Sequence, residues 1–192
     1  MLLLGWLCLG AMAVSPFLLV GGKQVGPITG EWTEVELKRA FGARQVLHER
    51  LYYREGESAA GLVVYRVPVY RPENRILRIA TDNAGRAATV EIHDDRFYTA
   101  SGVRVGMTLR ELELKNGRPF QMYGFAWDHE GLVVGWNGGR LAKELERIGV
   151  TLLPMDRMGS REVQGDGEFR SDHPVLRKLN PRVVQILMPL EP

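Results

Sequence analysis

The sequence predicts an α+β fold in which an antiparallel sheet carries helices on one face. Two observations lead to this expectation: short helix signals alternate with β-rich runs, and a helix-plus-hairpin pattern occurs twice along the chain. The 192 residues fit one domain, and 45% of them are hydrophobic, which suffices for a substantial core. We expect a single domain over residues 31–192.

The N-terminal segment predicts export. Residues 1–22 carry no charged side chain, and the apolar run has about the length that crosses a bilayer. The small residues of Ala11-Met12-Ala13 form an A-x-A pattern typical of a signal-peptidase site. We therefore expect residues 1–22 to be a signal peptide or membrane anchor, followed by a glycine-containing linker over 23–30. This predicts a periplasmic or envelope-associated protein that meets the membrane only through this segment.

The first helix-plus-hairpin unit is expected over residues 31–69. Thr33 can cap a helix ending at Ala40, because Glu36 three residues later completes a capping box. Gly42 then stops that helix. The strands predicted after it are 46–54 and 62–69 around a turn at 55–60, then 75–81 and 88–93 around a turn at 82–85.

The second unit is expected over residues 106–136, with a helix that begins at Thr108 and stops at Gly117. Its threonine, leucine and glycine repeat the spacing of the first unit, and Gly-Leu-Val-Val occurs at 61–64 and again at 131–134. Neither small unit can bury its apolar faces alone, so we expect the two to share one sheet and one core. The remaining expectations are a hairpin of 120–127 and 132–136, a helix at 141–148, strands at 150–155 and 183–188, and a long loop at 159–173.

Three blocks carry a family resemblance: residues 102–108, 116–120 and 124–128. They read GVRVGMT, NGRPF and GFAWD, which resemble the pattern G-I-x-I-G, N-G-x-P-F and G-F-x-W-D. The chain thus resembles a widespread group of small, uncharacterised exported bacterial proteins over most of residues 26–190. The resemblance implies an exported domain and carries no activity. A helix ending in glycine before a hairpin is also similar, at the level of fold alone, to the repeats of β-lactamase inhibitor protein and of the small lipoprotein of the barrel-assembly machine, both protein-binding modules.

Composition excludes several function classes. The 25 basic residues nearly balance 23 acidic ones, and the net charge of +2 gives no field for nucleic acid. We interpret the scattered arginines as a solvated surface. The one cysteine, Cys8, lies in the export segment, which excludes a disulfide framework and a multi-cysteine zinc site. The nucleotide-binding glycine motifs do not occur. We therefore expect neither a cofactor nor a metal.

The compact acid–histidine cluster at Asp128, His129 and Glu130 supports an alternative. A hydrolase or metal-dependent enzyme could use Asp128 and His129 with Asp172 or His173, provided that these ligands converge. Neighbouring residues on a tight turn point in different directions, however, and the turn is where the chain departs from the family pattern. We therefore favour a charged, solvated hairpin tip without a catalytic role.

The aromatic side chains of the second hairpin give the candidate binding site. Alternation places Tyr123, Phe125 and Trp127 on one face of their strand. This face is either covered by helices as part of the core or exposed as a strip that binds a protein or glycan, since exposed tryptophan and tyrosine favour binding hot spots. The sequence predicts a non-enzymatic envelope binding module. Its candidate site residues are Tyr123, Phe125, Trp127, Trp136, Arg118 and Arg140.

Overall fold

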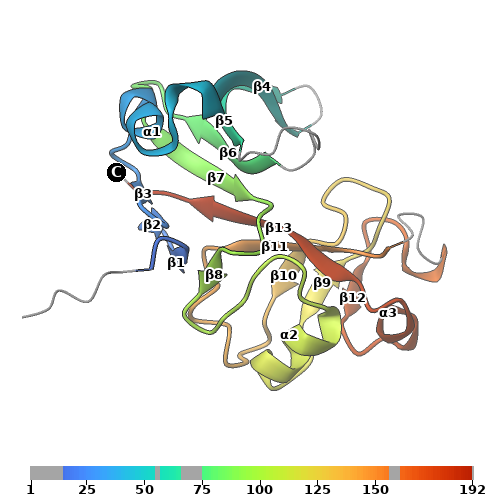
Figure 1. Ribbon diagram of the computed structural model, residues 1–192. Coiled ribbons are helices and arrows are strands. Elements are labelled where there is room, and N and C mark those ends of the chain that lie inside the picture. Colours follow the sequence, from blue (N-terminus) through green and yellow to red (C-terminus); the bar gives the residue numbers. More distant parts are fainter. Residues whose placement is uncertain (1–14, 55–56, 66–74, 156–160, 192) are drawn as a thin grey trace, which may run out of the picture.

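The computed structural model describes residues 15–54, 57–65, 75–155 and 161–191. The fold is α+β, as the sequence predicts, and its largest sheet is antiparallel throughout (Figure 1). This six-stranded sheet has the order β11-β13-β7-β6-β5-β4. Its strands are β4 (Val46–Arg54), β5 (Glu57–Tyr65), β6 (Arg75–Thr81), β7 (Ala87–Ile92), β11 (Gly149–Leu153) and β13 (Arg182–Pro189).

The first unit begins with the predicted capping box. Thr33 caps helix α1 (Glu34–Phe41), and the Glu36 carboxylate accepts a 2.9 Å hydrogen bond from the Thr33 backbone N–H. Gly42 ends the helix with a φ of 92°, and a short 3₁₀ turn, Ala43–Gln45, leads into β4. Strand β5 starts earlier than predicted because it pairs with almost the whole length of β4. Residues 66–69 of the expected unit lie outside the described residues.

The structure corrects the expected linker at 23–30. Strands β1 (Leu18–Val20), β2 (Gln24–Val25), β3 (Ile28–Thr29) and β8 (Tyr98–Thr99) form a four-stranded sheet. Val25 and Ile28 are completely buried, and Gly26 takes a φ of 56° in the turn between them. The glycines here form tight turns between very short strands. The amino-acid composition of such a segment is the same as that of a linker, so composition alone does not distinguish the two.

The expected export segment overlaps this sheet. Strand β1 lies within residues 1–22, Leu19 is buried, and β1 pairs in parallel with β8. The first 14 residues of the segment lie outside the described residues. Among the helices of the described part, none has the length and apolar character needed to cross a membrane.

In the second unit, Thr108 and Glu111 form the capping box of helix α2 (Leu109–Asn116), and Gly117 follows it in the left-handed conformation. Strand β9 (Gln121–Tyr123) lies between β10 (Val133–Gly135) and β12 (Glu168–Arg170) in a separate three-stranded sheet. The expectation that both hairpins share one sheet is therefore wrong. Strand β9 is too short to extend the large sheet, because the chain turns away after Tyr123.

Strand β13 connects the two halves of the molecule. Ile186 lies opposite Ile92 of β7 and opposite Val150 of β11, so the sheet of the first unit continues into the second (Figure 1). The buried apolar residues of both halves form one continuous core. The two units thus share a core, although their hairpins belong to different sheets.

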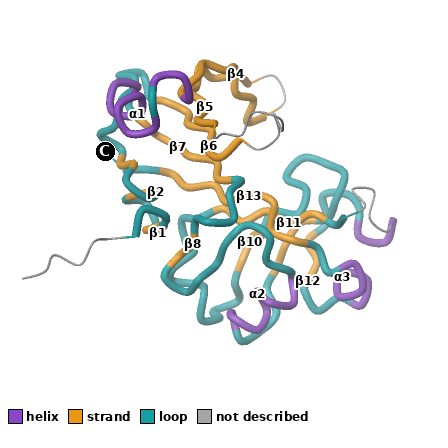
Figure 2. Tube along the Cα trace, in the orientation of Figure 1, coloured by secondary structure: helices purple, strands orange, loops and turns teal. Residues whose placement is uncertain are grey.

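Two further expectations are corrected. Residues 141–148 form successive turns, and the connection from β10 to β11 runs as a loop (Figure 2). Leu145 donates to the carbonyl of Leu141 as in an α-helix, but Ala142 and Ile148 donate to carbonyls three residues back. The expected loop at 159–173 contains a 3₁₀ turn, Arg161–Val163, and strand β12. Helix α3 (Pro174–Leu179) follows; its proline at the first helical positions is a start signal.

Candidate functional site

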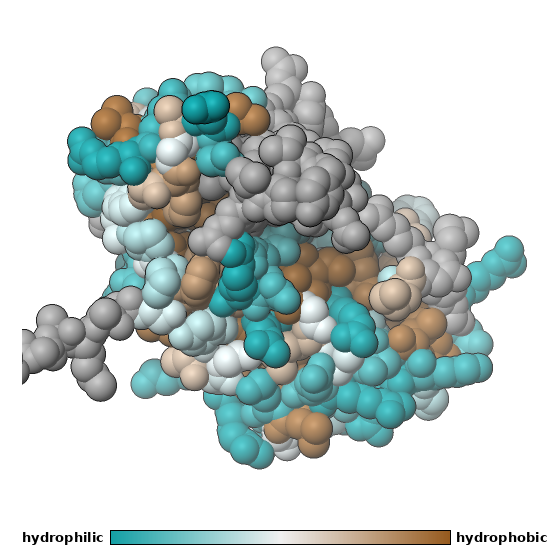
Figure 3. Space-filling model, in the orientation of Figure 1, coloured by the Kyte–Doolittle hydropathy of each residue, from teal (hydrophilic) through white to brown (hydrophobic). Residues whose placement is uncertain are grey.

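A surface groove of about 710 Å³ lies between helices α2 and α3 and the chain that follows α2. A second hollow of about 460 Å³ adjoins it and shares Gly117, Arg118 and Pro119. Hydrophilic surface covers the region of α2 and α3, interrupted by apolar patches (Figure 3). We call the two hollows together the arginine groove. Its lining residues are Arg110, Glu113, Leu114, Gly117, Arg118, Pro119, Gln121, Asn137, Arg140, Arg170 and Arg177.

Helix α2 supplies one wall of the groove. Arg110, Glu113 and Leu114 are three and four residues apart, a spacing that brings side chains to one side of a helix. The opposite side of α2 buries Leu109 and Leu112 in the core. Leu114 is 77% exposed, which is unusual for a leucine and leaves an apolar contact open beside the arginines.

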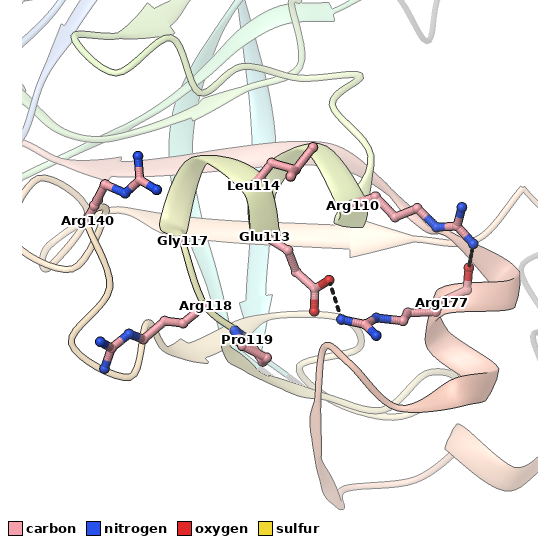
Figure 4. Close-up of a pocket in the computed structure, with 8 residues that line it drawn as sticks. All are labelled: Arg110, Glu113, Leu114, Gly117, Arg118, Pro119, Arg140 and Arg177. Atoms are coloured by element: carbon pink, nitrogen blue, oxygen red, sulfur yellow. Dashed lines mark hydrogen bonds and ion pairs between the residues drawn. The ribbon is translucent and has the colours of Figure 1, made fainter.

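The buried amide of Asn116 holds the end of the groove that carries Arg118 and Arg140. Asn116 is 1% exposed, and its Nδ2 donates to the carbonyls of Arg118 (2.9 Å) and Trp136 (3.0 Å). Its Oδ1 accepts from the Leu141 N–H at 3.3 Å. These bonds fix the backbone of Arg118 against the segment that carries Arg140. The two arginine side chains therefore share one end of the groove (Figure 4).

Glycine is required where Arg140 crosses the end of α2. Gly117 has a φ of 76°, and a Cβ at this position would come within 2.8 Å of the Arg140 Nε. The Arg118 Nη1 donates to the Asn137 carbonyl at 3.1 Å, and the Asn137 Nδ2 donates to the Pro119 carbonyl at 3.0 Å. The left-handed turn at Gly117 thus lets the Arg140 guanidinium approach the helix end closely.

A carboxylate orders the other end of the groove. The Arg177 Nη2 donates to the Glu113 Oε2 at 3.1 Å, and the Ser171 hydroxyl donates to the Glu113 Oε1 at 2.6 Å. The Arg110 Nη2 donates to the backbone carbonyl of Arg177 at 3.1 Å. Both oxygens of Glu113 are therefore engaged, and they hold helix α3 beside α2 (Figure 4).

The groove carries excess positive charge. Arg177 pairs with Glu113, and Arg170 pairs with Asp172 through bonds of 3.0 and 2.8 Å. Hydrogen bonds from the Arg170 guanidinium hold the pKa of Asp172 below its usual value. The guanidinium groups of Arg110, Arg118 and Arg140 form no ion pair with any described residue. Guanidinium groups bind carboxylates and phosphates through paired hydrogen bonds, so this arrangement is suited to an anionic ligand.

The predicted aromatic site divides between core and surface. Phe125 is 0% and Trp136 is 8% exposed, so both are corrected from candidate binding residues to core residues. Tyr123 is half-buried against the ring of His129, with 5.7 Å between centroids, and Trp127 is 64% exposed. The predicted common face does not form, because β9 ends at Tyr123 and Ala126 takes a left-handed φ of 69°. Of the six candidates, Arg118 and Arg140 line the groove.

The residues of the enzyme alternative have separate roles. The His173 Nδ1 accepts the Val175 N–H at the start of α3 and its ring lies 5.8 Å from that of Phe169, whereas His129 contacts Tyr123. Asp172 binds Arg170. Asp128 is exposed on the turn. No group of three histidine, cysteine or acidic residues that could hold a metal occurs in the part of the chain that the structure describes.

Sequence reasoning missed Arg110, Glu113, Arg170 and Arg177. The helical spacing of Arg110 and Glu113 was visible, but their partners lie far along the chain: Arg177 is 67 residues from Arg110. Helix α3, which carries Arg177, was itself not predicted. The convergence of these arginines is therefore a property of the tertiary structure.

Comparison with known proteins identifies a structure of similar fold. No family model matches the chain, and no curated protein matches it. The crystal structure of the uncharacterized protein yfeY from Escherichia coli superposes with a TM-score of 0.52 at 16% identity, over 88% of this chain and 98% of that chain. The likeness is one of fold. It supports the α+β architecture and carries no ligand or activity to this chain.

Proposed function

We propose that this chain is an exported, non-enzymatic binding module of the bacterial cell envelope, and that the arginine groove holds its ligand. The proposal rests on three guanidinium groups that line one groove, those of Arg110, Arg118 and Arg140. None of the three forms an ion pair with a carboxylate of a described residue, whereas Arg177 pairs with Glu113. Like charges held together destabilise a folded protein, and a bound anion offsets that repulsion. Export is supported by the charge-free residues that precede β1 and by the A-x-A pattern at Ala11-Met12-Ala13.

Binding is favoured over catalysis by the state of the groove's carboxylate. Both oxygens of Glu113 are occupied by Ser171 and Arg177, so this group is tied to a structural role and not poised to move a proton. The other polar side-chain groups that line the groove are guanidinium and amide groups, which bind and orient a ligand.

The proposal is tested by thermal unfolding in the presence of multivalent anions. Citrate, tripolyphosphate and poly-glutamate are each compared with sodium chloride at equal ionic strength. We expect at least one of them to raise Tm; a ligand at 100 times its Kd stabilises by about 2.7 kcal/mol. The double variant Arg118→Gln/Arg140→Gln should lose this increase. Arg39→Gln, which removes an exposed arginine of α1 outside the groove, should retain it.

Two results would contradict this function. One is a Tm that no anion raises beyond the effect of sodium chloride. The other is an equal loss of the increase in Arg39→Gln and in the groove variant, which would indicate general charge screening.

The export part has a separate test. The full chain with a C-terminal tag should appear in the periplasmic or envelope fraction of a bacterial host, and mass spectrometry of its N-terminus identifies any cut. Cleavage after Ala13, as the A-x-A pattern predicts, leaves Val14 as the first residue. Recovery of the uncut chain in the cytoplasmic fraction would contradict export.

A further inference from the structure

We infer that the ligand of the arginine groove is an extended, acidic peptide segment of a partner protein with apolar residues between its carboxylates. This inference rests on the proposed function and specifies the ligand class. Two features of the groove support it: the distribution of its charges along its length and its exposed apolar contact.

The groove is elongated and its charges are spread along it. The hollow of about 710 Å³ has Arg110 and Arg177 at one end and Arg118 and Arg140 at the other (Figure 4). The hollow of about 460 Å³ continues past Arg118 to Arg170. A single compact anion would contact one end only. A ligand with carboxylates at intervals, such as an extended peptide, can meet both ends.

The lining combines charge with exposed apolar surface. Leu114 is 77% exposed and lines the groove together with Pro119. A purely polar anion would leave this leucine in water. An apolar side chain between two acidic residues would cover it, and removal of apolar surface from water favours binding.

The same lining argues against a neutral glycan. No aromatic side chain occurs among the described residues that line the groove, so a sugar ring has no flat apolar surface on which to stack. The partner recognised by this chemistry is therefore an acidic peptide. A phosphate-bearing lipid or free polyphosphate also binds guanidinium groups, so the test includes both as competing ligands.

The test measures fluorescence anisotropy of a labelled peptide that repeats Glu-Ser-Leu-Ser, with a glutamine-for-glutamate peptide as its matched control. Every second side chain of an extended peptide faces the same side, so the glutamates and leucines of this repeat can meet the groove together. We expect the acidic peptide to bind, and the glutamine peptide to bind at least about tenfold more weakly. Arg118→Gln/Arg140→Gln should weaken binding of the acidic peptide by a similar factor, and Arg39→Gln should leave it unchanged. Leu114→Ser should weaken binding of the acidic peptide. It should not change the affinity for tripolyphosphate, because that ligand has no apolar group.

Two further arms separate the sources of the anion: tripolyphosphate, and vesicles of phosphatidylglycerol compared with phosphatidylcholine. Arginine-dependent binding of either phosphate ligand without binding of the peptide would overturn the peptide inference and leave the proposed function standing. Peptide binding that Leu114→Ser and the glutamine control do not weaken would also overturn it. If no ligand depends on Arg118 and Arg140, the proposed function fails as well. Circular dichroism of each variant ensures that only folded protein is compared.

Discussion

The carboxylate of Glu113 accepts a 2.6 Å hydrogen bond from the hydroxyl of Ser171, a buried residue 58 positions further along the chain. The same hydroxyl accepts the backbone N–H of Phe120 at 3.0 Å. One serine therefore joins helix α2, the start of β9 and the residues before α3. The wall of the groove that contains Glu113 and Arg177 is held in place before any ligand arrives, which reduces the ordering that binding requires.

Replacement of Ser171 by alanine should destabilise the fold. It leaves the buried Phe120 N–H without an acceptor, and an unsatisfied buried donor costs about 1–3 kcal/mol. Urea unfolding measures the loss. Glu146→Gln, on an exposed turn, is the control and should stay within about 0.5 kcal/mol of the parent chain. A Ser171→Ala chain as stable as this control would show that the bond to Phe120 is dispensable.

Gly139 should not tolerate a methyl group. A Cβ there would overlap the side-chain amide of Asn116, which is buried and already bonded to three backbone groups. Gly139→Ala should therefore cost about 1–3 kcal/mol, the usual penalty of overpacking. Gly135→Ala is the matched control, because nothing lies within 4 Å of its new Cβ. Equal unfolding free energies for the two variants would contradict the role of Asn116.

The capping box of α2 should make stability depend on pH. The Thr108 backbone N–H and hydroxyl donate to the Glu111 carboxylate at 2.7 and 2.8 Å, and these bonds hold the pKa of Glu111 below its usual value. The stabilisation is therefore present above the ordinary glutamate pKa of about 4.3 and is lost as the pH falls through the lowered pKa of the folded state.

We expect Glu111→Gln to be less stable than the parent chain at pH 7, by up to about 1 kcal/mol, and nearly equal to it at pH 2. Urea midpoints at the two pH values measure the difference. The exposed control Glu146→Gln should show no such convergence. A constant difference between parent and Glu111→Gln across this range would mean that the carboxylate charge contributes nothing.

The start of the folded domain should lie before Phe17. The rings of Phe17 and Phe97 meet edge to face at 5.3 Å, and Leu19 of β1 is buried. A chain that begins at Val14 keeps these contacts, whereas one that begins at Lys23 loses them. Loss of one large buried side chain costs about 2–5 kcal/mol, a large part of a typical stability of about 5–15 kcal/mol. Thermal unfolding of the two chains measures the loss of stability, and Leu19→Ala serves as a milder variant. Equal Tm values would restore residues 1–22 as a segment outside the fold.

The features that the sequence predicted well are local ones. The predicted capping box of α1 depends on a threonine and a glutamate three residues apart, and α2 starts after Thr108 as predicted. The turn after β6 depends on the Asp82 carboxylate, which accepts the N–H groups of Ala84 and Arg86. The errors concern distant partners. Leu141, Leu145 and Ile148 are buried, but their segment forms turns and not the predicted helix. Residues 23–30 show no strand alternation because β2 and β3 have two residues each; β2 pairs with β1, and β3 pairs with β2.

The candidate site shows the same division. Arg118 and Arg140 flank the second hairpin in the sequence, and the structure places both in the groove. Their neighbours Arg170 and Arg177 come from an interval expected to be a loop and from a helix that was not predicted. Phe125 and Trp136 follow a pattern that fits a core face as well as an exposed strip, and alternation alone does not distinguish the two. The left-handed turn at Ala126 decides the outcome.

The position of β13 has a consequence for biosynthesis. This strand, Arg182–Pro189, is the last along the chain, yet it lies inside the six-stranded sheet between β7 and β11. Until residues 182–189 leave the ribosome, β7 and β11 each lack a neighbour, and the two halves of the core have no shared strand. Pairings between residues far apart in sequence form late and slowly. The largest sheet therefore closes only after residues 182–189 have been synthesised, an order of events compatible with the proposed export of an unfolded chain through a translocation channel.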